Sequence, residues 1–159
     1  PGRMGAGVVI TAPAGTRHAL SQAGHAVGCN NEAELRALML ALGELKALGA
    51  TAVRAYSDNS ILVEQLGDAG ARPIARLAAL YEAARALLAS FEAASLHWVP
   101  RHRNQEADAL ARAALGFGPK PPPRAKHRRR WARQGEGLSC ASIAACAFAA
   151  AQPERPIHR

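Results

Sequence analysis

Hydrophobic and polar positions follow two different periods in the first part of the chain. A β-branched run at 5–11 predicts a strand, and a second strand is expected within 17–28, after the turn at 13–15. The short turn joins these strands as an antiparallel hairpin. Apolar residues then recur at three- and four-residue spacing over 35–45, which predicts a helix with one buried face that ends at Gly49.

The alternation of strands and helices continues over the second half of the predicted domain. The pattern predicts a strand at 51–57, a short helix at 59–66, a longer helix at 73–91, a strand at 95–99 and a final helix at 104–115. The expected order of elements is therefore β-β-α-β-α-α-β-α. This order is typical of an α/β domain.

Composition limits the class of protein. The chain has 159 residues, of which 49% are hydrophobic and only 4% aromatic, so one domain with an aliphatic core is expected. Its three cysteines show no CxxC spacing, which argues against a disulfide framework and a zinc site and indicates a reducing, cytoplasmic setting. The apolar run at 143–151 is too short to span a bilayer, and no membrane association is expected.

Positive charge is concentrated at one end of the chain. Residues 1–118 contain 11 basic and 10 acidic side chains, whereas 119–159 contain 9 and 2. We therefore predict a domain at 1–117 and a basic tail at 118–159 that is rich in proline, arginine and alanine and is disordered. The tail either holds nucleic acid phosphates or is a solvated extension without a role. Within it, 139–151 could form a short alanine-rich helix.

Three carboxylates lie at junctions between predicted elements. Glu34 precedes the first apolar helix stripe, Asp58 follows the strand at 51–57, and Asp108 lies near the start of the last helix. Taken singly, each has a structural explanation: an acid in a first helical turn stabilises by about 0.3 to 1 kcal/mol, and Asp58 could be a helix N-cap. Because sites in open α/β sheets form beyond the carboxyl ends of strands, all three could also reach one shared edge.

Four windows of the sequence, at 2–10, 30–35, 57–65 and 104–111, resemble the ribonuclease H family in order and spacing. The resemblance covers about residues 1–115. It implies a ribonuclease H-like mixed sheet, with an antiparallel hairpin plus parallel strands, flanked by helices. It also implies a metal-dependent endonuclease that hydrolyses the RNA strand of RNA/DNA hybrids with two Mg²⁺ ions, or with Mn²⁺ in their place.

The resemblance assigns roles to individual residues. Asp108 would bind the metal ion on the nucleophile side, and Glu34 and Asp58 would bind the other ion. His102 would assist proton transfer or product departure, although a solvated loop histidine between two arginines is the alternative. Asparagines would contact the hybrid; for the pair that precedes the first helix, capping explains one of the two. These asparagines are Asn30, Asn31 and Asn104.

One departure from the family pattern concerns the middle of the sheet. The family has a first, central strand with a fourth carboxylate, followed by a turn, and this chain begins with Pro1 and Gly2 inside that turn. We expect a fragment of a longer parent, with weak or no activity and with unpaired backbone groups where the first strand is missing. A catalytically inactive ribonuclease H-like nucleic-acid-binding module is the alternative. Either protein is expected to be a monomer that binds nucleic acid.

Overall fold

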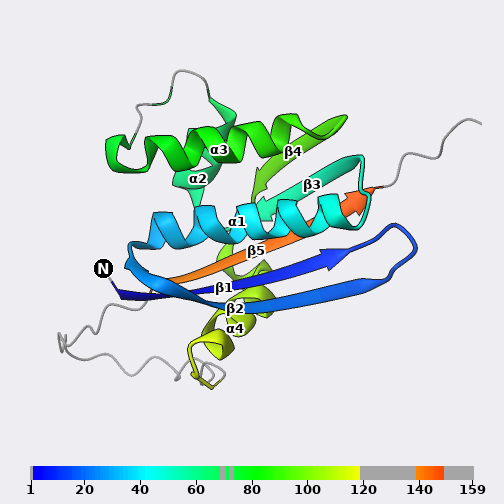
Figure 1. The fold of residues 1–159 in the computed structure, drawn as a ribbon. Coiled ribbons are helices and arrows are strands. Elements are labelled where there is room, and N and C mark those ends of the chain that lie inside the picture. Colours follow the sequence, from blue (N-terminus) through cyan, green and yellow to red (C-terminus); the bar gives the residue numbers. More distant parts are fainter. Residues whose placement is uncertain (1, 69–70, 72–73, 119–138, 149–159) are drawn as a thin grey trace, which may run out of the picture.

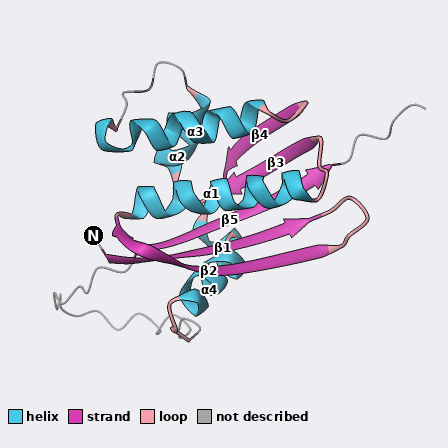
Figure 2. Ribbon diagram, in the orientation of Figure 1, coloured by secondary structure: helices cyan, strands magenta, loops and turns pink. Residues whose placement is uncertain are grey.

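Five strands form one mixed sheet with helices on both faces (Figure 1). The computed structural model describes residues 2–68, 71, 74–118 and 139–148. The strand order is β2-β1-β5-β3-β4. Figure 2 shows α1 and α3 on one side of this sheet and α4 on the other. None of the helices in the described part of the chain is long and apolar enough to cross a membrane.

The predicted hairpin is confirmed. Strand β1 (Gly2–Thr11) pairs antiparallel with β2 (Arg17–Gly28), in a register that runs from Gly2 opposite Gly28 to Thr11 opposite Arg17. Gly15 has a φ of 86°, a left-handed conformation that glycine adopts without a steric penalty, and it lets the chain reverse within the connecting turn.

Helices and strands after the hairpin follow the predicted order. The long third helix differs in that it begins with a separate 3₁₀ turn, and Pro73, its predicted start, lies outside the described residues. The elements are α1 (Asn30–Ala47), β3 (Ala52–Ser57), α2 (Ser60–Gly67), η1 (Ala75–Leu77), α3 (Ala78–Ala89), β4 (Ala93–Trp98), η2 (Arg101–Arg103) and α4 (Gln105–Ala114).

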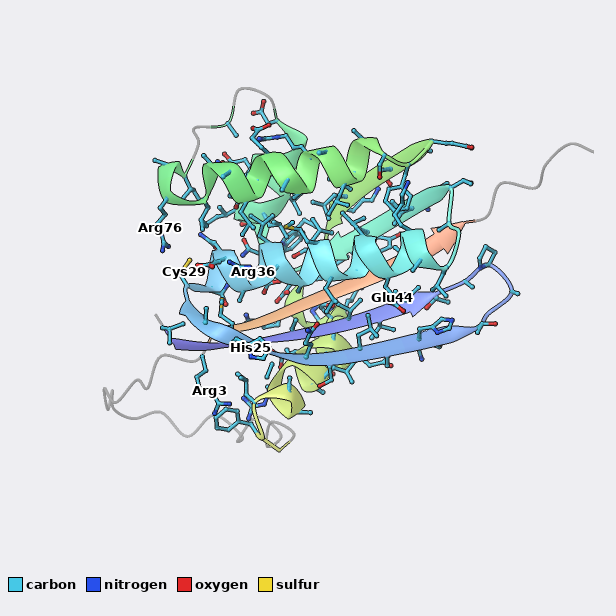
Figure 3. All side chains as sticks on the ribbon, viewed as in Figure 1. Arg3, His25, Cys29, Arg36, Glu44 and Arg76 are labelled. Carbon is cyan, nitrogen blue, oxygen red and sulfur yellow. The ribbon has the colours of Figure 1, made fainter. Side chains whose placement is uncertain are left out.

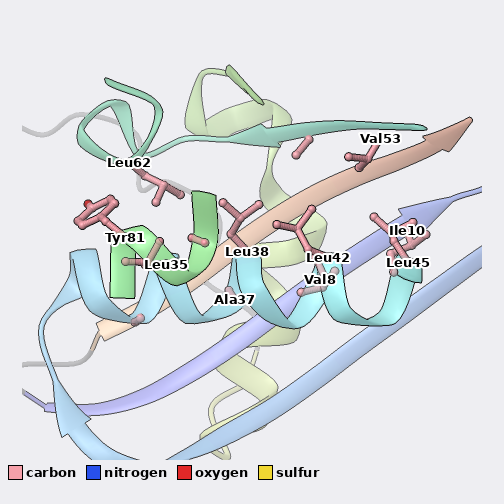
Figure 4. Close-up of a cluster of buried hydrophobic side chains, with 14 of the residues drawn as sticks. Val8, Ile10, Leu35, Ala37, Leu38, Leu42, Leu45, Val53, Leu62 and Tyr81 are labelled. Carbon is pink, nitrogen blue, oxygen red and sulfur yellow. The ribbon is translucent and has the colours of Figure 1, made fainter. Parts of the chain in front are cut away.

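The main core lies between α1 and the sheet (Figure 4). The apolar stripe predicted for this helix is buried at Leu35, Leu38, Leu42 and Leu45. Alternate residues of β1 complete the core because side chains in a strand point to opposite faces at a period of two. These strand residues are Met4, Val8 and Ile10.

The opposite face of β1 is kept bare by glycines. A Cβ built on Gly5 would meet the carbonyl oxygen of Ala111, and a Cβ built on Gly7 would overlap the carbonyl oxygen of Ala107. Helix α4 therefore lies directly on the backbone of β1, and only glycine permits so close an approach. This contact fixes the distance between α4, which carries Asp108, and the sheet.

The middle of the sheet contradicts the sequence-based expectation. Strand β5 (Ser139–Phe148) lies between β1 and β3 and pairs with both, so these backbones are not left unpaired. The alanine-rich helix expected at 139–151 is wrong over this strand, and this part of the predicted tail belongs to the sheet. Residues 119–138 and 149–159, with the Arg128–Arg130 run, lie outside the described residues.

Strand β5 runs in the opposite direction to the first, central strand that the family resemblance implies between β1 and β3. A strand that reached β1 through a tight turn would run antiparallel to it. Strand β5 instead runs parallel to β1, from Met4 opposite Ser139 to Thr11 opposite Cys146, and antiparallel to β3. The position between β1 and β3 is therefore occupied by a segment from the other end of the chain.

Candidate active site

Glu34 is buried on α1. The helix begins at Asn30, earlier than the apolar stripe suggests, and Figure 3 shows Cys29, its N-cap residue, at this end of α1. The Sγ of Cys29 accepts a hydrogen bond from the backbone N–H of Glu32. The acidic residue of the first turn is therefore Glu32, and Glu34 comes after that turn. Glu34 is only 1% exposed. First-turn dipole stabilisation does not explain a carboxylate whose burial is costly without compensating partners.

Asp58 follows the end of β3 in a turn that other side chains organise. The backbone N–H of Asn59 donates to Ser57 Oγ (3.1 Å), and Asn59 Oδ1 accepts from the N–H of Leu62 (3.1 Å), which makes Asn59 the N-cap of α2. The explanation of Asp58 as a helix cap is therefore wrong. Its side chain is 5% exposed and accepts hydrogen bonds from Arg101 and Asn104, which lie just before and at the start of α4.

Asn59 also joins two predicted parts of the site. Its Nδ2 donates to Asn31 Oδ1 (3.1 Å), so the first turn of α1 is tied to the turn that carries Asp58. Asn31 thus links two turns of the protein through its side chain. The N-cap of α1 is Cys29, so the expectation that capping explains one of Asn30 and Asn31 is wrong. Asn30 is exposed. Contacts of either residue with a hybrid remain a prediction.

Replacing Asn59 with alanine tests this link. The substitution removes the α2 cap and the hydrogen bond to Asn31, and we expect the free energy of unfolding to fall by about 1 kcal/mol, the usual cost of losing an N-cap. Urea denaturation followed by circular dichroism measures this change. Asn59→Ser keeps a capping oxygen and should recover most of the loss, whereas equal stability of the two variants would contradict the capping role.

Asp108 lies in the first turn of α4, where the dipole explanation remains open. Its backbone N–H donates to the carbonyl of Asn104 (3.1 Å), and Asn104 occupies the N-cap position. The side chain of Asn104 makes no capping hydrogen bond. Its Nδ2 instead donates to Asp58 Oδ1 at 2.9 Å, so the 2% exposed Asn104 connects the start of α4 to the end of β3.

Arg101 is the positive charge of the site. Its Nε donates to Asp58 Oδ2 at 3.0 Å. The pKa of Arg101 is raised above its usual value, chiefly by this hydrogen bond, while burial lowers it and the negative charges of Asp58, Asp108 and Glu34 raise it further. All three carboxylates therefore lie within electrostatic reach of one guanidinium.

His102 is exposed in η2, between Arg101 and Arg103. It lies in the loop between β4 and α4, next to the arginine that binds Asp58. Its predicted part in proton transfer or product departure stays a prediction.

The three carboxylates have the chemistry to bind a divalent cation, but in the described structure they are not arranged as a metal site. Carboxylate oxygens are the hard ligands that Mg²⁺ prefers, and the guanidinium of Arg101 already binds one of the three carboxylates, Asp58. Among the described residues, however, no group of three or more His, Cys, Asp or Glu side chains is arranged to hold a metal ion. The chain therefore offers ligands for a cation, while Arg101 neutralises Asp58 in the structure.

Comparison with known proteins places this geometry in a family. A family model described as "Reverse transcriptase-like" matches residues 1–114. The solved structure of the N-terminal RNase H domain of Rv2228c from Mycobacterium tuberculosis, a fusion with maltose-binding protein, is 36% identical with a TM-score of 0.55, covering 62% of this chain and 70% of that one. The chain belongs to the ribonuclease H family.

A second structure and two curated sequences agree with this assignment. RNase H1 from Halobacterium salinarum NRC-1 is 26% identical to this ribonuclease H-like chain, with a TM-score of 0.62 over 69% of this chain and 98% of that one. The "Bifunctional protein Rv2228c" of M. tuberculosis and the "Uncharacterized protein Mb2253c" of Mycobacterium bovis are each 37% identical over 118 residues. These matches cover 72% of this chain but only 32% of each relative, so the chain spans about a third of their length.

Proposed function

We propose that this ribonuclease H-like chain hydrolyses the RNA strand of RNA/DNA hybrids with the help of two divalent metal ions, Mg²⁺ or in its place Mn²⁺. The observation that carries the proposal is that Arg101 binds Asp58 directly and that the negative charges of Asp58, Asp108 and Glu34 all raise the pKa of its guanidinium. Two of these carboxylates have almost no exposed side chain, which is costly for a structural surface charge and useful for a cation ligand.

Each carboxylate would have a distinct part. Glu34 and Asp58 would hold one ion, and Asp108 would hold the ion beside the attacking water. When bound, such ions activate water and stabilise the departing oxygen of the phosphodiester. The protein contributes the orientation of the ligands: Asn104 holds Asp58 through Oδ1, and the contact between α4 and β1 fixes the position of Asp108.

The remaining residues would act on the substrate. His102 is exposed and follows Arg101, the residue that binds Asp58, and an imidazole can accept or deliver a proton. Asn30 and Asn31 begin α1, close to the turn of Asp58, and their amides can hydrogen-bond the 2′ hydroxyl that distinguishes RNA from DNA. Nucleic acid is thus the proposed partner, and a cytoplasmic monomer is the proposed state.

Cleavage of an end-labelled hybrid tests the proposal. We expect slow, Mg²⁺-dependent or Mn²⁺-dependent cleavage of the RNA strand, with duplex DNA of the same sequence left intact. Asp58→Asn keeps the volume of the side chain but removes its charge. We expect it to lower the cleavage rate at least about a hundredfold, because losing a ligand misplaces the ion. Cleavage that survives this substitution would contradict the assigned site.

A second candidate function is supported by a specific observation. The described residues contain no assembled metal cluster, and Asp58 is neutralised by Arg101. Both features suit a catalytically inactive module that binds nucleic acid. The same assay separates the two functions: binding of the hybrid without cleavage at any divalent ion concentration favours the inactive module.

A further inference from the structure

Arg101 and Asp58 form an unequal ion pair. The Asp58 side chain is 5% exposed, whereas the Arg101 side chain is 69% exposed. A carboxylate so far removed from water requires a positive or hydrogen-bonding partner, and losing it is costly. The guanidinium, in contrast, can return to solvent at small cost because an exposed arginine loses little hydration and regains rotamer freedom. Asp58 therefore depends on the pair more than Arg101 does.

Backbone hydrogen bonds hold Arg101 in η2, directly before α4. Arg101 begins η2, where the N–H of Asn104 donates to the carbonyl of Arg101 (3.0 Å) and the N–H of Asp108 donates to the carbonyl of Asn104 (3.1 Å). The segment 101–108 thus carries three groups of the site: the guanidinium of Arg101, the side-chain amide of Asn104 and the carboxylate of Asp108. The first two bind Asp58. Because the main chain of Arg101 is held in η2, directly before α4, movement of its side chain alone is enough to release Asp58.

We propose that Arg101 is the resident counter-ion of this site: it neutralises Asp58 when no metal is bound, competes with divalent cations for that carboxylate and withdraws when they bind. This inference rests on the proposed function, since it requires the carboxylates to accept a divalent cation. It makes Arg101 a positioning residue that holds Asp58 oriented toward α4 before a cation arrives. It also means that the intact chain binds cations more weakly than its carboxylates alone would.

Titration with Mn²⁺, followed by electron paramagnetic resonance of the free ion, tests the competition. We expect Arg101→Gln to bind Mn²⁺ about fivefold more tightly than the unchanged chain, which corresponds to an ion pair at the upper end of the exposed range. The matched control is Arg103→Gln, which makes the same change of charge two residues away, at an exposed side chain. We expect the control to change the affinity by less than about twofold because exposed charges are screened.

A second measurement uses the unchanged chain and does not depend on a variant that folds. In an NMR spectrum of the arginine Nε–H groups, the Arg101 signal should shift and exchange faster with water as Mg²⁺ is added, because its bond to Asp58 Oδ2 breaks. Arg85, which binds Glu82 and the carbonyl of Gln65, provides an internal control that should not respond.

The outcomes separate this inference from the proposed function. Equal or weaker Mn²⁺ binding by Arg101→Gln, or an Arg101 signal that saturating Mg²⁺ leaves unchanged, would overturn the counter-ion role while the nuclease proposal stands. Absence of Mn²⁺ binding by both proteins would overturn the inference and the metal-dependent function together.

Discussion

Truncation after Gly118 is expected to abolish cooperative unfolding, because it removes β5 from the middle of the sheet. Strand β5 pairs with β1 over Met4 to Thr11 and with β3 over Ala52 to Ser57, so its loss exposes the backbone of two strands. Each lost backbone hydrogen bond costs about 0.5 to 1.5 kcal/mol, and losing several of them approaches the total stability of about 5 to 15 kcal/mol of a small domain.

Thermal and urea unfolding, followed by circular dichroism, measure the effect of the truncation. A chain that ends at Phe148 is the matched control because it keeps every strand of the sheet, and we expect it to unfold in one cooperative transition. Ala144→Pro is a point-substitution counterpart: residue 144 is paired with Val9 on one side and Tyr56 on the other, and proline cannot donate to either ladder. An unchanged transition in the chain that ends at Gly118 would show that β5 does not hold the sheet together.

Gly7→Ala is expected to destabilise the protein by about 3 kcal/mol, at the upper end of the cost of overpacking. The new Cβ would overlap the carbonyl oxygen of Ala107 and the backbone nitrogen of Ala111, and it would lie 3.0 Å from Leu110 Cβ. Two of these atoms belong to the backbone of α4 and cannot rotate away. The helix must therefore move off β1, and it takes Asp108 with it.

The control for this prediction is a second glycine in a different environment. Gly43 lies within α1, and a Cβ built there meets nothing within 4 Å, so Gly43→Ala should leave stability unchanged or raise it by about 0.5 to 1 kcal/mol. Urea unfolding of the two variants gives the comparison. Equal stability of Gly7→Ala and the unchanged chain would show that α4 does not rest directly on β1.

Local sequence patterns predicted the elements whose formation depends on neighbouring residues. The leucines of α1 repeat at helical spacing, β1 contains a β-branched run, and a short turn follows it, so both elements and the hairpin could be predicted from the sequence. The start of α1 was predicted too late because its apolar stripe begins only at Leu35. The helix begins at Asn30, so Glu34 lies after the first turn and not within it.

Strand β5 could not be predicted from its own residues. Alanine, the strongest helix former, recurs through Ser139–Phe148, and the segment was therefore interpreted as a helix. Its strand conformation depends on backbone pairing with β1 on one side and β3 on the other. Tertiary pairing overrides intrinsic propensity here, and the partners are more than 80 residues away in the sequence.

The sequence suggested the acids of the candidate site, whose shared role stays a prediction, but it did not suggest the residues that contact them. Glu34, Asp58 and Asp108 stand out by sequence because each lies at a junction of elements, but Arg101 and Asn59 resemble ordinary loop and cap residues. Arg101 is 43 positions from Asp58, and Asn59 is 28 positions from Asn31. Only the fold brings these partners together, and no local period records the contact.

The central claim is that Glu34, Asp58 and Asp108 share one cation site, and paramagnetic broadening by Mn²⁺ tests it most directly. In a spectrum of the assigned backbone amides at substoichiometric Mn²⁺, we predict that the signals of these three residues broaden together and recover when excess Mg²⁺ is added. Exposed acids elsewhere, such as Glu82 and Glu92, should stay sharp. If one of the three carboxylate residues keeps a sharp signal while the other two broaden, the shared site is contradicted.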